Sequence, residues 1–416
     1  MNVRRTAAVL AAVAVTGAAS APAALAETPK PSPSVALPSG LYGKADPQFD
    51  GVWRQSLAFL AQDTASVRPA DKAVDWLTGQ QCADGSFAPF RADAAAACGK
   101  KTPVDSNSTA AAVQALAALG GHEKTTGKAV GWLKSVQNKD GGWGYNPGGA
   151  SDTNSTSLVI GALKAAGEDP AGVRKGGKSP FDALDALTVP CTVKDGGGAF
   201  AFQPGKSAGG QQPGPLEPNA DASAAGVLGS LGKGLAATGG GKDAGGACVE
   251  PGAATPKESA AGAADYVEKE LTGGTHLMSV MPGAEKKPDF GNTADTVVAL
   301  AAAGRPDAAR KAYGWLEKNA ADWARGGGPA AYAQLVLAAH AVGADPRAFG
   351  STDLVGALDA QGPAPESQKD GSAEDAEQDK EKDEDGTSVW WIVGVGLVAG
   401  IGVGFLFSSR NKKQGK

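Results

Sequence analysis

The stretch QNKDGGWGY at residues 137–145 decides how this chain folds, because a looser copy of it stands earlier in the sequence. The copy, QCADGSF, occupies residues 81–87, and both copies follow a segment that contains Trp-Leu. A helix leaves its last four carbonyl groups without partners, and a glutamine amide can donate to them. Asp-Gly is a turn signal. We therefore interpret the shared pattern as a structural joint between two helices, made by Gln81, Asp84, Phe87, Gln137, Asp140 and Trp143.

A second string recurs in front of alanine-rich segments. It reads DSNST from Asp105, DTNST from Asp152, NADAS from Asn219 and DFGNT from Asp289, and each copy reaches a glycine eleven residues after its last Thr or Ser. Polar capping residues before an apolar run, with glycine after it, mark the start and the end of a helix. The copies begin 47, 67 and 70 residues apart. Periods of this length indicate repeated helical hairpins.

The Trp-Leu segments provide a second helix between successive copies, as in AVDWLTGQ at 73–80. We expect the alanine-rich helices to form an inner ring, because small side chains allow close approach, and the Trp-bearing helices to form an outer ring. Strand signals are nearly absent, and only the glycine-rich loops around 195–215 and 237–247 are expected to pair briefly. The patterns predict twelve helices, near residues 50–62, 70–80, 107–120, 126–138, 153–167, 179–188, 221–236, 257–271, 292–304, 306–319, 329–342 and 351–360.

The two ends of the chain indicate export and anchoring. Arg4 and Arg5, an apolar run and Ala24-Leu25-Ala26 are typical of a secretory signal peptide. Residues 389–407 carry no charge over 19 positions, which is enough to span a bilayer, and basic residues follow them. We expect a single-pass cell-membrane protein with its domain outside. The expected parts are a signal peptide (1–26), a disordered lead (27–44), a folded domain (45–360), an acidic disordered stalk (361–387), a transmembrane helix (388–408) and a cytoplasmic basic tail (409–416).

Charge and cysteine usage narrow the function classes. The net charge is −5 and no basic patch is present, so we expect no nucleic-acid partner. Disulfides are the default for cysteines in an exported chain, and four cysteines allow three pairings. We favour Cys82–Cys98 and Cys191–Cys248, because each pair lies within one repeat and closes one long loop. No C-x-x-C spacing occurs, so we predict no metal site from these thiols.

The two joints resemble the repeat motif of the terpenoid cyclase and protein prenyltransferase superfamily, also called the prenyltransferase/squalene oxidase repeat. A worn third copy runs from Asp195-Gly196 to Phe200. The resemblance implies an all-α fold, an α6/α6 toroid of six helical hairpins, over most of the folded part. It also implies that the glutamine donates to backbone at a helix end, that Asp-Gly makes the turn and that the aromatic ring stacks across the connection.

The catalytic branches of this superfamily fit the sequence less well. Squalene-type cyclases protonate their substrate with a D-x-D-D acid, and this string does not occur in the chain. Protein prenyltransferases hold zinc through Asp, Cys and His. Only three histidines are present, His122, His276 and His340, and of these we keep His276 alone as a candidate contact. We therefore predict no catalytic residue, no metal ligand and no established cofactor.

A non-catalytic branch, the cobalamin carriers of the transcobalamin and intrinsic-factor kind, is similar in compartment and in its disulfides. Helices of these carriers often begin with an Asp-Thr string, as at Asp152-Thr153 and Asp295-Thr296. The carriers use a second, β-rich domain. A carrier function here would thus need a β-rich partner chain, and the membrane anchor would suit a transporter in the same membrane.

If the ring closes, the polar strings meet at one mouth. Capping explains part of each string, and the surplus polar groups would suit an amide-rich ligand such as a corrinoid. Our leading hypothesis is a non-catalytic surface toroid that binds a small ligand, with a corrinoid such as cobalamin as the candidate, for uptake. The alternatives are a prenyltransferase- or terpene-cyclase-like enzyme with an atypical active site, and a cell-envelope interaction scaffold. The candidate ligand contacts are Tyr145, Asn146, Asp105, Asn107, Asp152, Asn154, Asp221, Asp289 and Phe90, with Asn219 in the same collar.

Overall fold

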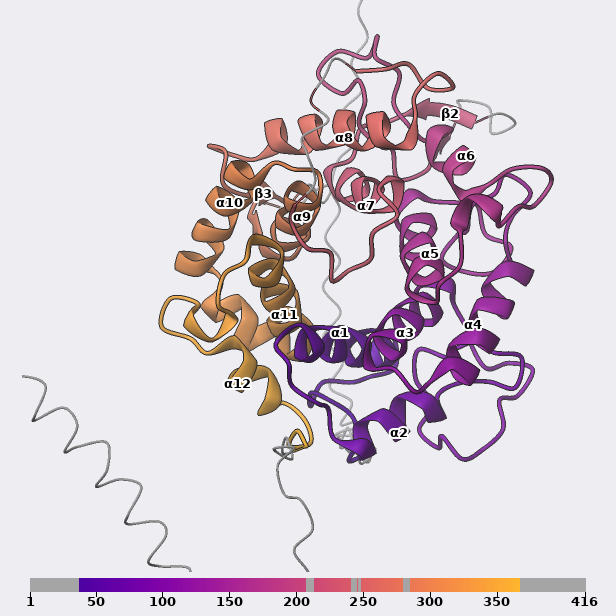
Figure 1. The fold of residues 1–416 in the computed structure, drawn as a ribbon, viewed down its shortest axis with the longest axis vertical. Helices are drawn as coiled ribbons and strands as arrows, with labels where there is room; N and C mark the ends of the chain where they lie inside the picture. The colour runs from indigo at the N-terminus through magenta and orange to yellow at the C-terminus, as the bar shows by residue number, and fades with distance from the viewer. Residues whose placement is uncertain (1–36, 207–212, 241–244, 246–247, 280–284, 367–416) are drawn as a thin grey trace, which may run out of the picture. The chain divides into compact units, whose positions relative to one another are not determined.

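A computed structural model describes residues 37–206, 213–240, 245, 248–279 and 285–366. Six helices form a closed inner ring, in which each helix packs against the next and the last packs against the first (Figure 1). These helices are α1 (Gly51–Thr64), α3 (Ser106–Leu119), α5 (Thr153–Ala165), α7 (Ala220–Ser230), α9 (Phe290–Ala302) and α11 (Ala321–Val342).

Six further helices alternate with the inner ones along the chain and lie outside them (Figure 1). The fold of the described residues is thus the α/α toroid expected from the repeat, and all twelve predicted helices are present. None of the described helices has the length and apolar character needed to cross a membrane. The predicted signal peptide and transmembrane helix lie outside the described residues, as does most of the predicted stalk. The outer helices are α2 (Asp71–Gly79), α4 (Glu123–Ser135), α6 (Pro180–Asp185), α8 (Pro256–Glu270), α10 (Pro306–Asn319) and α12 (Leu354–Asp359), with 3-10 turns η1 (Pro170–Gly172) and η2 (Pro346–Ala348).

Two short antiparallel strand pairs complete the described structure. Strand β1 (Pro204–Lys206) pairs with β2 (Pro213–Leu216), and β3 (Leu277–Met278) pairs with β4 (Pro288–Asp289). The first glycine-rich loop therefore pairs with itself. The second loop does not join it among the described residues; instead, the Gly239 N–H donates to the carbonyl of Ala341 at 3.0 Å.

Helix α11 is longer than predicted because it joins two pieces across a kink. Gly328 has φ 67° and ψ −149°, which is not helical, and Pro329 follows it. Proline is tolerated in the first turn of a helix, where its missing N–H leaves no gap in the ladder. The second piece coincides with the predicted helix at 329–342, and the first adds a short segment that carries Trp323.

Small residues set the spacing of the inner ring. A Cβ on Gly229 of α7 would lie 2.4 Å from Oγ of Ser157 on α5, so only glycine allows these helices to approach so closely. The outer helices bear large buried rings instead, such as Trp76 and Trp132. Trp53 departs from this division, because it stands on the inner helix α1.

The joint at 137–145 is held by its own polar groups. The Gln137 side chain donates from Nε2 to the carbonyls of Gly141 (2.8 Å) and Val173 (3.2 Å), and Asp140 accepts from the N–H of Gly142 (3.0 Å). Gly141 has φ 91°, and a Cβ there would meet a backbone carbonyl at 2.2 Å. Glycine is therefore required by both conformation and space. Gln81 makes the corresponding bonds in the first copy, to the carbonyls of Gly85 and Thr125.

The two recurring strings bind each other. In the 137–145 joint, the N–H of Trp143 donates to Oγ1 of Thr156, the last residue of the next DTNST string, at 3.1 Å. The same bond recurs in the three other repeats, at 2.9 to 3.0 Å. Each joint thus fastens the start of the inner helix that follows it. The corresponding donor and acceptor pairs are Phe87 with Thr109, Phe200 with Ser223 and Leu277 with Thr293.

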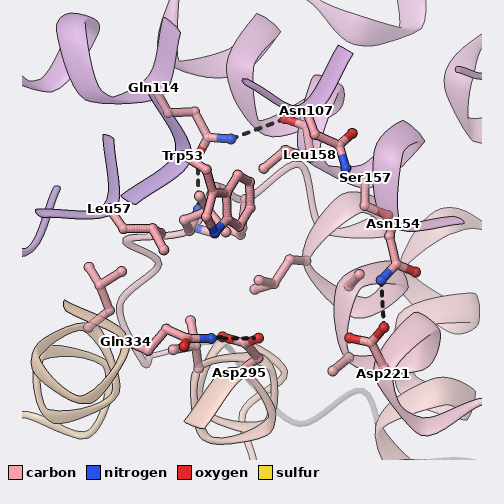
Figure 2. Close-up of a pocket in the computed structure, with 18 residues that line it drawn as sticks. Trp53, Leu57, Asn107, Gln114, Asn154, Ser157, Leu158, Asp221, Asp295 and Gln334 are labelled. Carbon is pink, nitrogen blue, oxygen red and sulfur yellow. Dashed lines mark hydrogen bonds between the residues drawn. The ribbon is translucent and has the colours of Figure 1, made fainter. Parts of the chain in front are cut away.

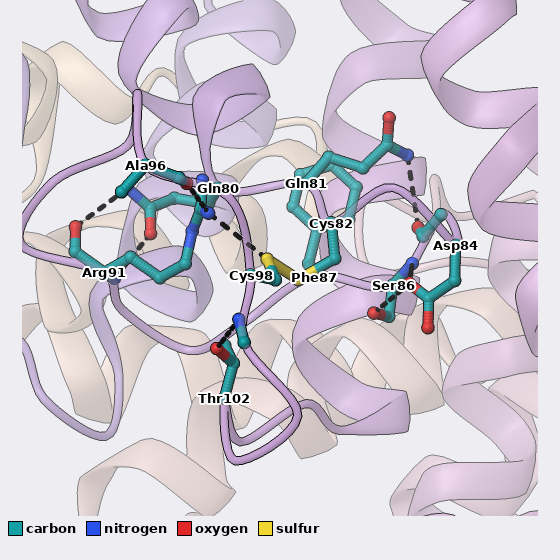
Figure 3. The surroundings of a disulfide bond; sticks show 12 residues. Gln80, Gln81, Cys82, Asp84, Ser86, Phe87, Arg91, Ala96, Cys98 and Thr102 are labelled. Atoms are coloured by element: carbon teal, nitrogen blue, oxygen red, sulfur yellow. Dashed lines mark hydrogen bonds between the residues drawn. A yellow bond between two sulfur atoms is a disulfide. The ribbon is translucent and has the colours of Figure 1, made fainter.

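Both disulfides favoured from the sequence are present, Cys82–Cys98 and Cys191–Cys248. Figure 3 shows the first of them beside Arg91. The Arg91 guanidinium donates to the carbonyls of Ala94 (2.8 Å) and Ala96 (2.6 Å), and also to the carbonyl of Gly79 at the end of α2. This arginine and the disulfide together fix the loop that leaves the first joint.

The ring is closed by contacts between sequence segments that lie far apart. Gln62 at the end of α1 donates to a carboxylate oxygen of Asp359 in α12 at 2.7 Å, across 297 residues. The N–H of Gly43 donates to the carbonyl of Gln361 at 2.8 Å. The first and last hairpins therefore form a seam, which holds the toroid shut.

Candidate functional site

A cavity of about 250 Å³ lies within the inner ring, and all six inner helices contribute side chains to its lining. Part of the wall is apolar, with Trp53 and Leu57 from α1, Val298 from α9 and Leu337 from α11. Figure 2 shows Trp53 and Leu57 across the cavity from a group of polar side chains. Apolar walls with a few placed polar groups are the usual composition of a small-molecule site.

The recurring polar strings divide into two roles. The first residue of each string caps its own helix, as Asp105 and Asp152 do by accepting from an N–H three residues on at 2.6 Å. Asn219 and Asp289 cap α7 and α9 in the same way. The third residue of three strings points elsewhere. Those three residues line the cavity: Asn107, Asn154 and Asp221.

Five polar residues that line the cavity were not among the predicted contacts: Gln114, Ser157, Lys233, Asp295 and Gln334. Asp295 on α9 and Gln334 on α11 form a pair. Nε2 of Gln334 lies 3.2 Å from each carboxylate oxygen of Asp295 (Figure 2). Asp295 is partly accessible from the cavity, and protein surrounds it on its other sides. This burial, and secondarily the nearby Asp221, raises the pKa of Asp295 to about 7. The carboxyl is therefore available as a neutral acid near pH 7.

Asp221 is the second carboxyl of the cavity. Its Oδ2 accepts from Nδ2 of Asn154 at 2.8 Å. Burial raises the pKa of Asp221, the hydrogen bond from Asn154 opposes that shift, and the charge of Asp289 adds to it. The cavity thus contains two carboxyls whose ionised forms are disfavoured by burial.

Several buried polar atoms at the cavity have no partner among the described residues. They are Oγ of Ser157 and the side-chain oxygens of Asn107 and Asn154. Ser157 is only 4% exposed. An unpaired buried polar atom costs free energy, so these three atoms reduce the stability of the ring where the inner helices pack closely.

The loop after α7 closes part of the cavity. Gln114 accepts at Oε1 from the N–H of Leu235 (2.9 Å) and donates from Nε2 to the carbonyl of Leu158 (3.1 Å). A Cβ on Gly234 would lie 2.5 Å from that same Oε1, so the loop passes here because glycine has no side chain. Gln114 therefore links α3, α5 and the loop, and the loop limits the extent of the cavity.

Other predicted contacts lie away from this cavity. Tyr145 is 45% exposed and Asn146 is exposed, and both stand in the loop of the second joint. Phe90 stacks on Trp76 of the outer helix α2. His276 stacks on Trp315 with ring centroids 4.1 Å apart. None of these four candidates lines the cavity.

A metal site is not formed by the described residues, in which no group of three or more His, Cys, Asp or Glu side chains is arranged to hold an ion.

The sequence signal that would have identified Asp295 is simple. It is an acidic residue near the start of the otherwise apolar stretch TADTVVALAAAG, where burial of an unpaired carboxylate is costly.

Comparison with known proteins gives one local sequence match. No protein-family profile matches the chain. The drimenyl diphosphate synthase of Streptantibioticus cattleyicolor is 42% identical over 73 residues, which is 18% of this chain and 12% of that protein. The match therefore spans far less than two thirds of the synthase.

Solved structures with similar folds include cyclases and carbohydrate enzymes. The ent-copalyl diphosphate synthase from Streptomyces platensis has a TM-score of 0.46 at 15% identity, over 70% of this chain and 50% of that one. The type II terpene cyclase MstE from Scytonema has 0.41 at 15%, over 67% and 72%. A sugar epimerase from a ruminal bacterium has 0.44 at 12%, over 68% and 80%.

Proposed function

We propose that the toroid is a terpene-cyclase-like enzyme that binds a short, largely apolar isoprenoid in its ring and protonates it with Asp295. The observation that carries this proposal is the carboxyl of Asp295, with a pKa of about 7, in a cavity walled partly by apolar side chains. The local match to a protein named drimenyl diphosphate synthase, over 18% of this chain, is consistent with an isoprenoid as the ligand. This function corresponds to the terpene-cyclase-like alternative rather than to the non-catalytic, corrinoid-binding toroid expected first.

The chemistry follows from the surroundings of the carboxyl. A general acid works best with a pKa near the operating pH, where it is both protonated and able to release its proton. When Asp295 transfers its proton to a double bond of the ligand, the O–H bond breaks, a C–H bond forms and the ligand becomes a carbocation that cyclises and then loses a proton to water. The Asp295 carboxylate shares the negative charge over its two oxygens until solvent returns a proton to it. The amide of Gln334, 3.2 Å from both, is placed to stabilise that charge.

The missing D-x-D-D string does not remove an acid from the ring. Asp295 stands inside α9, behind the capping string that begins at Asp289, and so presents a carboxyl from a different sequence context. The size of the cavity argues against a corrinoid inside it. About 250 Å³ is below the roughly 300–1,000 Å³ of pockets for drug-sized ligands, and a corrinoid is larger than such ligands.

The proposal keeps the cell-membrane location predicted from residues 1–26 and 388–408. An apolar substrate and its products partition into a bilayer, so an enzyme anchored beside one would meet them at high local concentration. This part of the proposal rests on the sequence alone.

The test is turnover by the full-length chain. Purified protein is incubated with geraniol, farnesol and their diphosphates, and extracts are analysed for cyclic products by gas chromatography with mass detection. We expect Asp295→Asn to lower turnover by about 10²–10⁴-fold while ligand binding persists. Asp75→Asn, an exposed change on α2, is the matched control and should leave turnover unaltered. Absence of product from the wild-type chain, or full activity of Asp295→Asn, would overturn the proposal.

A further inference from the structure

We infer that the polar end of the ligand is a neutral hydroxyl group that donates hydrogen bonds, and that a diphosphate is excluded from the ring. This inference rests on the proposed function and names the substrate class of the same site. It separates this chain from the relative named a diphosphate synthase. The substrate is accordingly an isoprenoid alcohol rather than an isoprenoid diphosphate.

The polar part of the cavity is rich in acceptors. Asp221 and Asp295 contribute carboxyl oxygens, and Asn154 uses its amide N–H on Asp221, which leaves its own oxygen unpaired. Oγ of Ser157 is also unpaired but is packed against Gly229 of α7, so the acceptors that a ligand can meet are those of the two carboxyls. A ligand hydroxyl brings a donor to these carboxyl oxygens. A diphosphate at neutral pH brings only further acceptors.

The charges point the same way. A diphosphate would place its negative charges beside Asp221 and Asp295, two cavity carboxyls whose ionised forms are already disfavoured, chiefly by burial. Lys233 is the one basic side chain among the described residues that line the cavity. It comes from the loop after α7 and is exposed, and no arginine accompanies it to form a bidentate clamp.

The inner helix ends do not compensate for the missing cations. Helix N-termini bind phosphate through their free N–H groups. Here, Asp105, Asp152, Asn219 and Asp289 already occupy N–H groups in the first turns of α3, α5, α7 and α9. Three of these caps are carboxylates. An anion at these helix ends would therefore meet a charge of its own sign instead of free N–H donors.

The position of the acceptors suits an alcohol with an apolar body. The apolar wall is formed by Trp53, Leu57, Val298 and Leu337, and Figure 2 shows Trp53 and Leu57 across the cavity from Asn154 and Asp221. A prenyl chain can cover the first group while its hydroxyl meets the second. With about 250 Å³ of space, the ring suits chains of a few isoprene units.

The experiment compares head groups on the same chain length. Geraniol and geranyl diphosphate, then farnesol and farnesyl diphosphate, are titrated into the full-length protein, with calorimetry as the readout. We expect each alcohol to bind at least about tenfold more tightly than its diphosphate. The diphosphate cannot donate a hydrogen bond to the carboxylates, and its negative charge is repelled by theirs. Asp221→Asn should weaken alcohol binding about tenfold and narrow the difference, because the amide removes the charge and adds a donor. Asp75→Asn should change neither affinity.

The outcomes separate this inference from the proposed function. Tighter or equal binding of the diphosphates overturns the inference, and Asp295-dependent turnover can still hold in that case. Alcohol binding that is selective but yields no product supports the inference and overturns the proposed catalysis. If neither head group binds the wild-type chain, both are wrong.

Discussion

Replacing Asp295 by asparagine tests the chemistry of the ring without a substrate. The pKa of this carboxyl is about 7 in the folded chain, against 3.8 as its ordinary value. Below pH 4 the group is neutral in both states. As pH rises from about 4 to 7, the unfolded chain releases the proton while the folded chain keeps it, so the free energy of unfolding falls. Above pH 7 the loss is constant.

The size of this loss follows from the pKa difference. It amounts to about 4 kcal/mol above pH 7, since each pKa unit corresponds to about 1.36 kcal/mol. Asparagine has the same shape and no charge to bury. The stability of Asp295→Asn relative to the wild-type chain should therefore rise by about 4 kcal/mol between pH 4 and pH 8.

Urea unfolding of both chains at pH 4, 6 and 8 measures this difference. Asp75→Asn, on the exposed face of α2, should run parallel to the wild type at every pH. If Asp295→Asn also runs parallel to the wild type, the carboxyl is ionised in the folded ring at neutral pH. The reasoning about its role as an acid would then be refuted.

Three further predictions concern the framework. Gly141→Ala should lower the free energy of unfolding by about 2 kcal/mol or more, because both its positive φ and a close carbonyl oppose a Cβ; Gly177→Ala, with φ 81° and open space, should cost less in the same thermal melts. Replacing Cys82 and Cys98 by serine should cost about 3 kcal/mol in urea unfolding, for a closed loop with a sequence separation of 16; an unchanged midpoint would contradict this. Thr156→Val should cost about 1–3 kcal/mol, since it leaves a buried N–H of the joint unpaired, and a loss below 0.5 kcal/mol would show that the bond is dispensable.

The architecture could be predicted because its signals are local. Capping strings, terminal glycines and Asp-Gly turns each specify one helix end, and all twelve predicted helices lie close to their expected positions. Both disulfides could be favoured because each closes one repeat. The piece of α11 after Gly328 was predicted at 329–342, and the piece before it was missed because Gly326-Gly327-Gly328 favour a loop in a sequence pattern. The lead was expected to be disordered up to residue 44, but Leu41 and Tyr42 are buried and Gly43 bonds to Gln361 at the start of the expected stalk. The rest of the lead and of the stalk, and the membrane span, stay predictions.

The candidate site was predictable only at the helix starts. Asn107, Asn154 and Asp221 could be singled out because capping does not need them, and they do line the cavity. Asp295 and Gln334 lie further along their helices; the charge of Asp295 in an apolar stretch was the one local signal, and no pattern marked Gln334. Their pairing depends on which helices the ring makes neighbours, and the raised pKa depends on burial by the whole ring. Neither the pairing of Asp295 with Gln334 nor the raised pKa of Asp295 can be read from a periodic sequence pattern.

The seam between the first and last hairpins has a consequence for synthesis. The hydrogen bond between Gln62 and Asp359 joins residues 297 positions apart in the sequence, so the ring cannot close until both have been synthesised. Until then, α1 exposes an apolar flank that α11 will cover, and the nascent chain has no enclosed chamber. Long-range closures of this kind are slow and leave aggregation-prone intermediates, so the chain needs protection until its last hairpin has been synthesised. The enclosed cavity would thus form only once the final hairpin has docked.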